Sequence, residues 1–384
     1  MKNKTIACDV LVVGAGVSGF AAAISASRKK VKVIVLEKNS FPGGTAVICM
    51  HRYICGLTGN RKGIVSEIAD KVSPGRKLLR IGKVRVLPFK TEKLILGLGR
   101  IIKCEKRIRI FYNSKAVSVK KVGNRIALVI ADYARGKIFI KPKVVIDASG
   151  EGDIIKLSGA KYKISALNKR QLSGFSFKVK GLKGDRGILA WKVPYYLAKG
   201  VSSKGLPEYF KFSLFSPGDS REEGFIKLSI PPLKHADSGK ITNKNSARAH
   251  NYLRKSLPEF RNSYITQVSP DVSNREGLRL LGEYVLTKKD ILNQKKFPDA
   301  VAKGYWPIEF WHKKSGPSFK YLKKGGFYEI PLRCLKSKNI SNLFATGRCI
   351  SADPYALAST RVMGTCIALG EAVGQAASKL CAYS

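Results

Sequence analysis

The stretch DVLVVGAGVSGFAAAISAS, residues 9–27, decides the fold. Residues 9–13 are a short apolar run that predicts a buried parallel strand, and the glycine turn GAGVSG follows at once at 14–19. Small helix-forming residues then continue to position 28, and a second apolar run at 31–36 ends at Glu37. Strand, glycine turn, helix and strand therefore follow one another as a complete βαβ unit.

The glycine turn has the spacing of a dinucleotide-binding fingerprint. Gly14 permits a tight turn, Gly16 lets the backbone approach a pyrophosphate, and Gly19 lets helix and strand pack closely. The N–H groups of the first helical turn then stabilise the phosphate charge. Glu37 lies 18 residues beyond Gly19, where its carboxylate can accept hydrogen bonds from ribose hydroxyls. The pattern predicts a dinucleotide cofactor.

The loop after Glu37 favours FAD over NAD. It reads KNSFPGGTA, and Gly43 and Gly44 offer a second backbone cradle that suits a cofactor bound in extended form. At this point the sequence resembles the FAD-dependent oxidoreductases of the glutathione-reductase-like superfamily, whose members carry two dinucleotide-binding domains. The N-terminal fingerprint is common to that whole superfamily.

Three later segments narrow the resemblance to one family of FAD-dependent oxidoreductases, distantly similar to fumarate reductase flavoproteins. Residues 146–160, IDASGEGDIIKLSGA, resemble its second glycine motif, and residues 274–292 are similar to its segment containing Arg and Glu. Residues 342–377, which begin NLFATGRCISADPYALASTRVMG, resemble its C-terminal signature. The resemblance implies a non-covalently bound FAD. The expected FAD contacts are Gly14, Gly16, Val17, Ser18, Gly19, Glu37, Lys38, Gly43, Gly44, Thr45, Val117, Ala148, Ser149, Gly150, Asp153, Gly347, Arg348, Gly364 and Thr365.

The C-terminal segment also has a physical interpretation. A helix that begins near residue 362 would point its positive end at the flavin pyrimidine ring. Backbone N–H groups near Gly364 and Thr365, together with Arg361, would then stabilise the negative charge of reduced flavin and raise its potential. Alternatively, the glycines of this helix, among them Gly370 and Gly374, serve only close packing.

Two further candidates lie outside the glycine motifs. Arg275, Glu276 and Arg279 would place two guanidinium groups on one side of a helical turn, where they could hold a carboxylate or phosphate. An ordinary ion pair within the helix is the alternative. His51 lies in a loop expected near the flavin, so it is a candidate for proton transfer or simply a packed residue.

Cysteine and histidine spacing argues against two other chemistries. Cys49 and Cys55 lie six residues apart with Ala46 where the disulfide reductases of the superfamily carry their first cysteine, so a dithiol coupled to the flavin is disfavoured. His235 and His250 have no partners at metal-ligand spacing, and no metal site is expected. Eight unevenly spaced cysteines fit a reducing cytoplasm rather than a disulfide scaffold.

The formal net charge of +45 favours anionic partners. The basic residues are scattered along the chain, which favours a solvated surface over one dedicated nucleic-acid groove. Nucleic acid stays possible but is not favoured. No segment has the apolar length of a membrane span once residues 10–26 are assigned to the glycine-turn unit.

The predicted fold is α/β, with a Rossmann-type FAD domain whose parallel sheet carries a three-stranded antiparallel insert, expected from runs at 108–122, 125–131 and 137–140. Residues 1–160 and 341–384 would form this domain, and residues 161–340 a mixed α+β substrate or cap domain with helices at 245–257 and 282–292. The expected reaction is hydride transfer between flavin N5 and a small, anionic organic substrate. A flavin enzyme acting on RNA and a flavin subunit that passes electrons to a partner protein stay open as alternatives.

Overall fold

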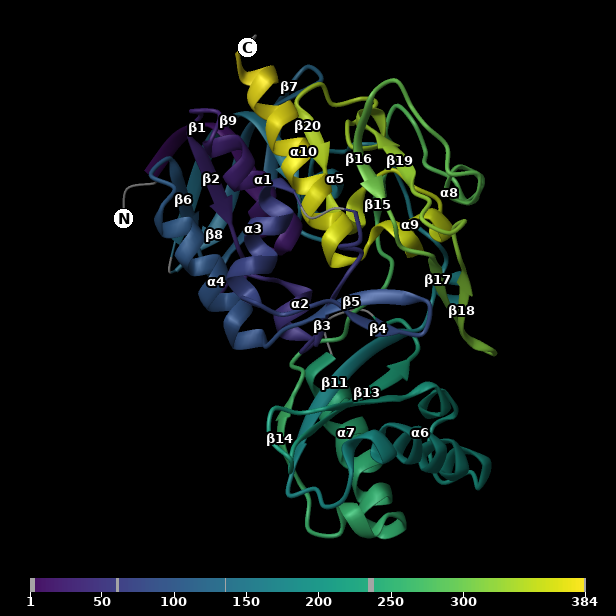
Figure 1. Cartoon of the computed structure of the whole chain (residues 1–384). Coiled ribbons are helices and arrows are strands. Elements are labelled where there is room, and N and C mark those ends of the chain that lie inside the picture. Colours follow the sequence, from purple (N-terminus) through teal and green to yellow (C-terminus); the bar gives the residue numbers. More distant parts are fainter. Residues whose placement is uncertain (1–3, 60–61, 135, 234–237, 383–384) are drawn as a thin grey trace.

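The computed structural model describes residues 4–59, 62–134, 136–233 and 238–382. Its main layer is a seven-stranded sheet in the order β6-β2-β1-β9-β8-β7, with β20 paired to β9 (Figure 1). The strands are β1 (Lys4–Val13), β2 (Val33–Leu36), β6 (Ile108–Phe111), β7 (Ser114–Val122), β8 (Arg125–Tyr133), β9 (Gly136–Asp147) and β20 (Leu343–Ala345). Both ends of the chain therefore contribute to one sheet.

The βαβ unit forms as predicted, and its helix α1 (Val17–Ser27) packs against the C-terminal helix α10 (Met363–Cys381). Glycines of α10 make this packing close. A Cβ at Gly370 would lie 2.0 Å from the carbonyl oxygen of Ser18, and one at Gly374 would lie 2.3 Å from that of Ala22. These two glycines therefore serve helix packing, and Figure 1 shows the two helices side by side over the sheet.

The antiparallel insert differs from its prediction. Residues 108–122 do not form one strand, because Asn113 has a left-handed backbone (φ 51) that ends β6 and starts β7 in a new direction. β6 is a parallel edge strand beside β2. The insert consists instead of β7, β8 and the first half of β9, which continues into the parallel sheet as one 12-residue strand.

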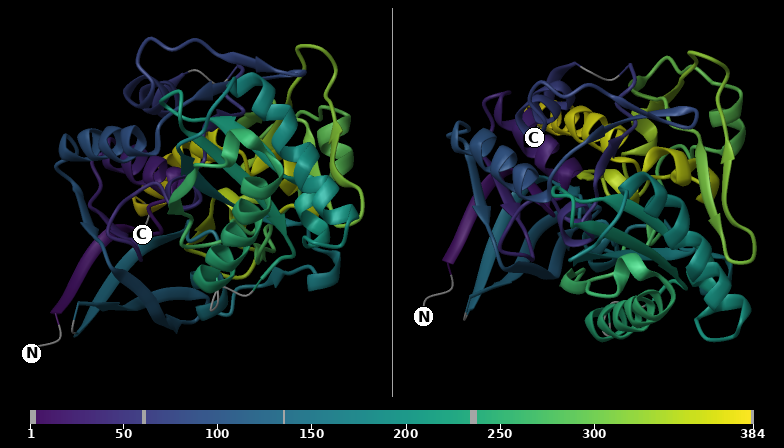
Figure 2. Two further views of the ribbon diagram at one scale, coloured as in Figure 1. Left: turned by 90° about the horizontal axis from the view of Figure 1, so that it is seen from below. Right: turned by 60° about the horizontal axis from the view of Figure 1, so that its bottom comes forward.

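A second sheet, in the order β12-β13-β11-β14, lies below the first and has its own apolar core (Figure 1; Figure 2, left, shows it from below). Two helices, α6 (Arg186–Ser202) and α7 (Ser238–Ser256), contribute to that core. The predicted helix at 245–257 therefore exists but begins earlier. The strands are β11 (Ser173–Lys180), β12 (Leu214–Pro217), β13 (Gly224–Ile230) and β14 (Tyr264–Val268).

The remaining elements lie between these strands along the chain. Between β2 and β6 lie α2 (Thr45–Ile48), β3 (Tyr53–Cys55), α3 (Gly63–Val72), β4 (Leu79–Ile81), β5 (Val84–Pro88) and α4 (Thr91–Lys103). Two short elements precede β11, namely α5 (Asp153–Leu157) and β10 (Tyr162–Lys163). The elements between β14 and β20 are β15 (Arg279–Leu280), α8 (Lys288–Leu292), β16 (Ala300–Gly304), β17 (Ile308–His312), β18 (Gly316–Lys320) and β19 (Tyr328–Pro331), and α9 (Pro354–Thr360) follows β20.

The predicted helix at 282–292 is wrong except for α8, because Thr287 caps the helix and forms a capping box with Asp290. The separate core of the second sheet contains buried residues from Phe175 to Val272 only. Later residues such as Ile308 and Tyr328 pack in the same core as Val10 of the main sheet. The domain boundaries predicted above stay a prediction.

Candidate active site

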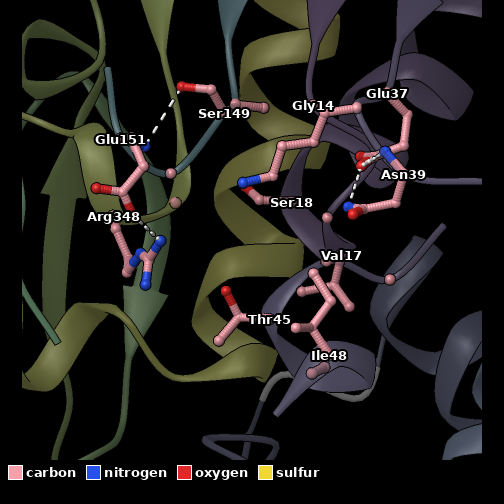
Figure 3. Close-up of a pocket in the computed structure, with 18 of the residues that line it drawn as sticks. Gly14, Val17, Ser18, Glu37, Asn39, Thr45, Ile48, Ser149, Glu151 and Arg348 are labelled. Carbon is pink, nitrogen blue, oxygen red and sulfur yellow. Dashed lines mark hydrogen bonds and ion pairs between the residues drawn. The ribbon is translucent and has the colours of Figure 1, made fainter. Parts of the chain in front are cut away.

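A cleft of about 1300 Å³, solvent at its mouth included, runs along the carboxyl ends of the parallel strands. Figure 3 shows part of its lining, with residues from both glycine motifs facing one another. The cleft brings together most of the residues singled out from the sequence. Those that line it are Gly14, Gly16, Val17, Ser18, Glu37, Lys38, Gly43, Gly44, Thr45, His51, Ala148, Ser149, Gly150, Asp153, Arg275, Gly347, Arg348 and Arg361.

One end of the cleft is built by the first glycine turn. Gly14 has φ +102, and a Cβ there would lie 2.5 Å from the carbonyl oxygen of Ala148. A Cβ on Gly16 would meet no protein atom within 4 Å, so the turn leaves open space on that side. Glu37 is buried, and its carboxylate accepts hydrogen bonds from Ala15 N at 2.6 Å and from Asn39 N at 2.9 Å.

Asp147 fixes the loop of the second glycine motif, which begins at residue 148, by hydrogen bonds. This buried carboxylate accepts hydrogen bonds from Ser149 Oγ at 2.7 Å and Ile155 N at 3.0 Å. Burial raises its pKa to about 6, although these hydrogen bonds oppose the shift. Beside the loop, Arg348 donates to Glu151 Oε1 at 2.8 Å (Figure 3). The loop is thus rigidly shaped where it faces the first turn.

The other end of the cleft carries two cations from separate segments, and a third cation lies beside them. Arg275 is buried and Arg361, which follows α9, is half-buried, and both line the cleft. Lys227 of β13 is half-buried and lies close to Arg275. Arg275 and Lys227 both lie close to Gly174 of β11, since a Cβ there would be 3.5 Å from Arg275 Nη2 and from Lys227 Cε. We call Lys227, Arg275 and Arg361 the cation group.

Two members of the cation group, Arg275 and Lys227, face the ring of Trp311. The guanidinium carbon of Arg275 lies 4.0 Å from the ring centroid, and Lys227 Nζ lies 5.7 Å from it. Glu309 is the carboxylate that attracts all three cations. Its two oxygens already accept the indole N–H groups of Trp306 at 2.9 Å and Trp311 at 2.8 Å. Glu309 is thus the one carboxylate common to the three cations and is itself occupied by neutral donors, while Glu276 also attracts Arg361.

Burial acts on each cation. It lowers the pKa of Lys227 to about 8 and that of Arg275 to about 9, and in both cases repulsion from a neighbouring guanidinium adds to the shift. The pKa of Arg361 is also lowered, by burial. Arg361 donates to the carbonyl oxygen of Glu309 at 3.0 Å, whereas its Nε is buried without a hydrogen-bond partner among the described residues. Desolvated and incompletely paired cations attract an anion strongly.

The family model for FAD dependent oxidoreductases matches residues 9–382. The chain belongs to this family. Its cofactor is FAD, and the protein is an FAD-dependent oxidoreductase.

One solved structure agrees at the level of the fold. The flavin-dependent brominase Bmp2 is 15% identical and superposes with a TM-score of 0.50 over 99% of this chain and 80% of the brominase. A geranylgeranyl bacteriochlorophyll reductase-like protein from Thermoplasma acidophilum is 15% identical with a TM-score of 0.49, over 98% of this chain and 78% of that protein.

A short segment matches a curated enzyme. It is 57% identical over 47 residues to 4-oxocyclohex-2-ene-1-carboxylate 5-dehydrogenase from Sinomonas cyclohexanicum. These residues are 12% of this chain and 8% of the dehydrogenase, so the likeness is confined to a small part of each protein.

The cleft of this FAD-dependent oxidoreductase fits its cofactor by two observations. The space beside Gly16 is open, and the N-termini of α1 and α10 have no side-chain cap. Uncapped helix N-termini with open space beside them suit the phosphates and the flavin of FAD.

Four predicted FAD contacts do not line the cleft. A Cβ at Gly19 would lie 2.0 Å from Gly14 O, so this glycine serves the packing predicted for it. A Cβ at Gly364 would lie 2.6 Å from the carbonyl oxygen of Gly56, so Gly364 admits a neighbouring loop. Thr365 lies beside that loop, and Val117 lies on β7, where Ser114, Lys115 and Ala116 line the cleft instead.

The predicted helical turn at Arg275, Glu276 and Arg279 is wrong. Arg279 lies on β15, and the residues before it are in an irregular segment that follows β14. Arg279 forms a buried ion pair with Glu276 at 3.4 Å. Arg275 points elsewhere and donates to the carbonyl oxygen of Leu172. Arg275 of the predicted pair therefore lines the cleft, whereas Arg279 stabilises the local structure.

His51 lines the cleft as expected, but its chemistry is restricted. Burial lowers its pKa to about 3, and Lys227, Arg275, Arg361 and Arg348 add to the shift. The imidazole is therefore neutral at pH 7. It can exchange hydrogen bonds but holds no spare proton for a substrate.

Neither the thiols nor the histidines that the structure describes form a second centre. Burial raises the pKa of Cys49 and of Cys55 to about 12, and all eight cysteines are free thiols. His250 shares a 2.9 Å hydrogen bond with Ser263 Oγ, and His235 lies outside the described residues. Among the residues that the structure describes, no cluster of His, Cys, Asp and Glu could hold a metal, and no helix has the length and apolarity needed to cross a bilayer.

Sequence reasoning missed Lys227, Glu309 and Trp311. Lys227 did carry a signal, because it is the charged residue in GFIKLSI, an otherwise apolar and uncharged strand. A lysine in such a strand is costly to bury without a function. Glu309 and Trp311 lie on β17 in the segment IEFWH, which has no recognisable motif.

Proposed function

We propose that this enzyme transfers a hydride between its flavin and a small organic substrate whose anionic group is held by the cation group. The observation that carries the proposal is the charge imbalance around Trp311. Lys227, Arg275 and Arg361 share Glu309, whose two carboxylate oxygens already accept indole N–H groups. A bound carboxylate would supply the missing negative charge.

The burial of Arg275 favours a small substrate. Arg275 is only 5% exposed, and a polymer backbone has no access to a guanidinium at such depth. A desolvated cation binds an anion far more strongly than an exposed one, because the local dielectric is low. The name of the dehydrogenase matched over 47 residues describes a cyclic carboxylate substrate, which is of this class.

FAD supplies hydride chemistry at its flavin, and the residues of this chain bind and orient it. We infer that the Gly16 turn and the 148–150 loop hold the pyrophosphate end, and that Glu37 accepts hydrogen bonds from the ribose. Arg361 and the start of α10 would stabilise negative charge on the flavin. The cofactor is held without a covalent bond in this proposal.

Lys227, which lies beside Arg275, can exchange a proton near neutral pH. Its pKa of about 8 contrasts with that of about 3 for His51. Hydride transfer to or from carbon is balanced by movement of one proton, and an acid or base with a pKa near the working pH is the most effective. We assign this proton to Lys227 Nζ and the positioning of the anion to the two arginines.

Anaerobic turnover against matched substrates tests the proposal. The oxidised holoenzyme is mixed with saturated and unsaturated cyclic carboxylates, and the reduced holoenzyme with 2-enoates, each paired with its neutral carboxamide. We expect at least one carboxylate to change the flavin spectrum about tenfold faster than its carboxamide. Equal rates for every acid and amide pair would contradict the anionic substrate.

A further inference from the structure

Helix α6 is apolar on two opposite sides. Leu189, Val193 and Leu197 face the core of the second sheet and are fully buried. On the side away from this core, Ile188 is 54% exposed, and two aromatic residues are more exposed still, Trp191 at 83% and Tyr195 at 65%. A helix in water normally presents polar residues on its outer side. The second apolar side therefore indicates a surface that α6 contacts.

The exposed residues share one helical face. Ile188, Trp191 and Tyr195 are spaced by three and four residues, which places them along one side of the helix. Figure 1 shows α6 at the outer edge of the second layer, away from the main sheet, and the right view in Figure 2 agrees. We call these three residues the α6 face.

Basic residues surround the α6 face. Lys183 precedes the helix, Lys199 lies in its last turn and Lys204 follows it, all three exposed. Lys192 is paired with Glu259 at 2.6 Å, and Asp185 caps the helix N-terminus. The unpaired excess around the apolar residues is therefore positive. Exposed Trp and Tyr beside Lys are the residue types that anchor proteins at the interface of a bilayer.

We propose that the α6 face docks the enzyme on the surface of an anionic lipid bilayer. Trp191 and Tyr195 would enter the headgroup region, and the neighbouring lysines would contact acidic lipids. The charge of the whole chain supports this occupant, since a protein of +45 is attracted to an anionic membrane. It disfavours a second copy, because two such chains repel each other.

Trp191 is an intrinsic fluorescence probe for this contact. Trp306 and Trp311, the other two tryptophans, are only 5% and 4% exposed. A blue shift of tryptophan emission when vesicles are added would therefore report on Trp191. Vesicles of phosphatidylcholine alone and of phosphatidylcholine with phosphatidylglycerol, in about a 3:1 ratio, separate apolar insertion from charge attraction.

The test uses the holoenzyme at about 0.1 M salt. We expect co-sedimentation with the mixed vesicles, a blue shift of emission, and about tenfold weaker binding to phosphatidylcholine alone. The triple variant Ile188→Ser, Trp191→Ser, Tyr195→Ser should bind the mixed vesicles about tenfold less. Val122→Ser is the matched control, because Val122 is 75% exposed on β7 and lies outside the α6 face. Flavin content and circular dichroism verify that each variant is folded.

Four outcomes would overturn the proposal. Equal binding to both kinds of vesicle would remove the role of acidic lipid. Unchanged binding of the folded triple variant would mean that net charge alone attracts the protein. If the wild type is a dimer in solution and the triple variant is a monomer, the α6 face binds a second copy. If neither protein binds vesicles and an acidic protein binds the wild type but not the variant, the α6 face binds that partner.

Discussion

The two ends of the cleft are built in different ways. The nucleotide end comes from contiguous motifs, in which Gly14, Gly16 and Glu37 follow one another along one βαβ unit. The cation group comes from β13, an irregular segment and the residue that follows α9. A cofactor site in this fold is specified by local backbone geometry, whereas the substrate site depends on how distant segments meet.

The largest effect is expected at the nucleotide end. Gly16→Val should lower FAD affinity roughly a hundredfold or more, because the added methyl groups would occupy the space of the pyrophosphate. The fold should survive, since Gly16 has φ −59 and a Cβ there meets no protein atom within 4 Å. Flavin absorbance after gel filtration measures the loss. Gly136→Val is the control, at an exposed glycine with equally open surroundings.

A folded Gly16→Val protein with full flavin content would show that FAD does not lie against the first glycine turn. The contrast between the two ends of the cleft would then fail, because the contiguous motif would have no cofactor role.

The nucleotide end was predictable because backbone rules act over short distances. Gly14, Gly16, Glu37 and the loop at 148–150 were all predicted, and all line the cleft. Lys227 was missed because its place beside Arg275, 48 residues later in the chain, depends on the packing of β11 and β13. No periodicity in the sequence encodes that contact.

Two errors in the predicted secondary structure have the same origin. The helix at 282–292 and the helical turn at Arg275 rested on local composition, but tertiary contacts bury Arg275 and Arg279 in irregular or strand structure. The cytoplasmic location, a redox partner protein and nucleic-acid binding stay predictions from composition.

Arg361 belongs to the cation group and is also proposed to stabilise the flavin, so its removal should have an intermediate effect. Arg361→Met should lower the two-electron potential by about 40 mV, if the guanidinium stabilises the reduced flavin by about 2 kcal/mol. FAD should stay bound, because the glycine turns are unchanged. Spectroscopic redox titration measures the shift, and Arg80→Met at an exposed site is the control. An unchanged potential with FAD bound would place Arg361 away from the flavin.

The smallest effect is expected from the thiols near the cleft. The double variant Cys49→Ser, Cys55→Ser should take up the same number of electrons per flavin as wild type. The raised pKa of both thiols, about 12, keeps them protonated, so they are poor nucleophiles for disulfide chemistry. Anaerobic dithionite titration counts the electrons. A loss of two electrons per flavin would reveal a dithiol coupled to the flavin.

The affinity of the cation group for an anion tests the central claim most directly. The holoenzyme is titrated with 4-oxocyclohex-2-ene-1-carboxylate and with its carboxamide under conditions without turnover, and the change in flavin absorbance gives each dissociation constant. Because the pKa of Lys227 is lowered to about 8, the ammonium is charged below that pH and neutral above it. Carboxylate affinity should therefore be constant near pH 7 and fall by up to about tenfold per pH unit above about pH 8.

We predict that the carboxylate binds about tenfold more tightly than the carboxamide near pH 7, and that Lys227→Met abolishes the fall in carboxylate affinity between about pH 8 and 9, below the range in which Arg275 titrates. Equal affinities for the carboxylate and the carboxamide at every pH would contradict the account.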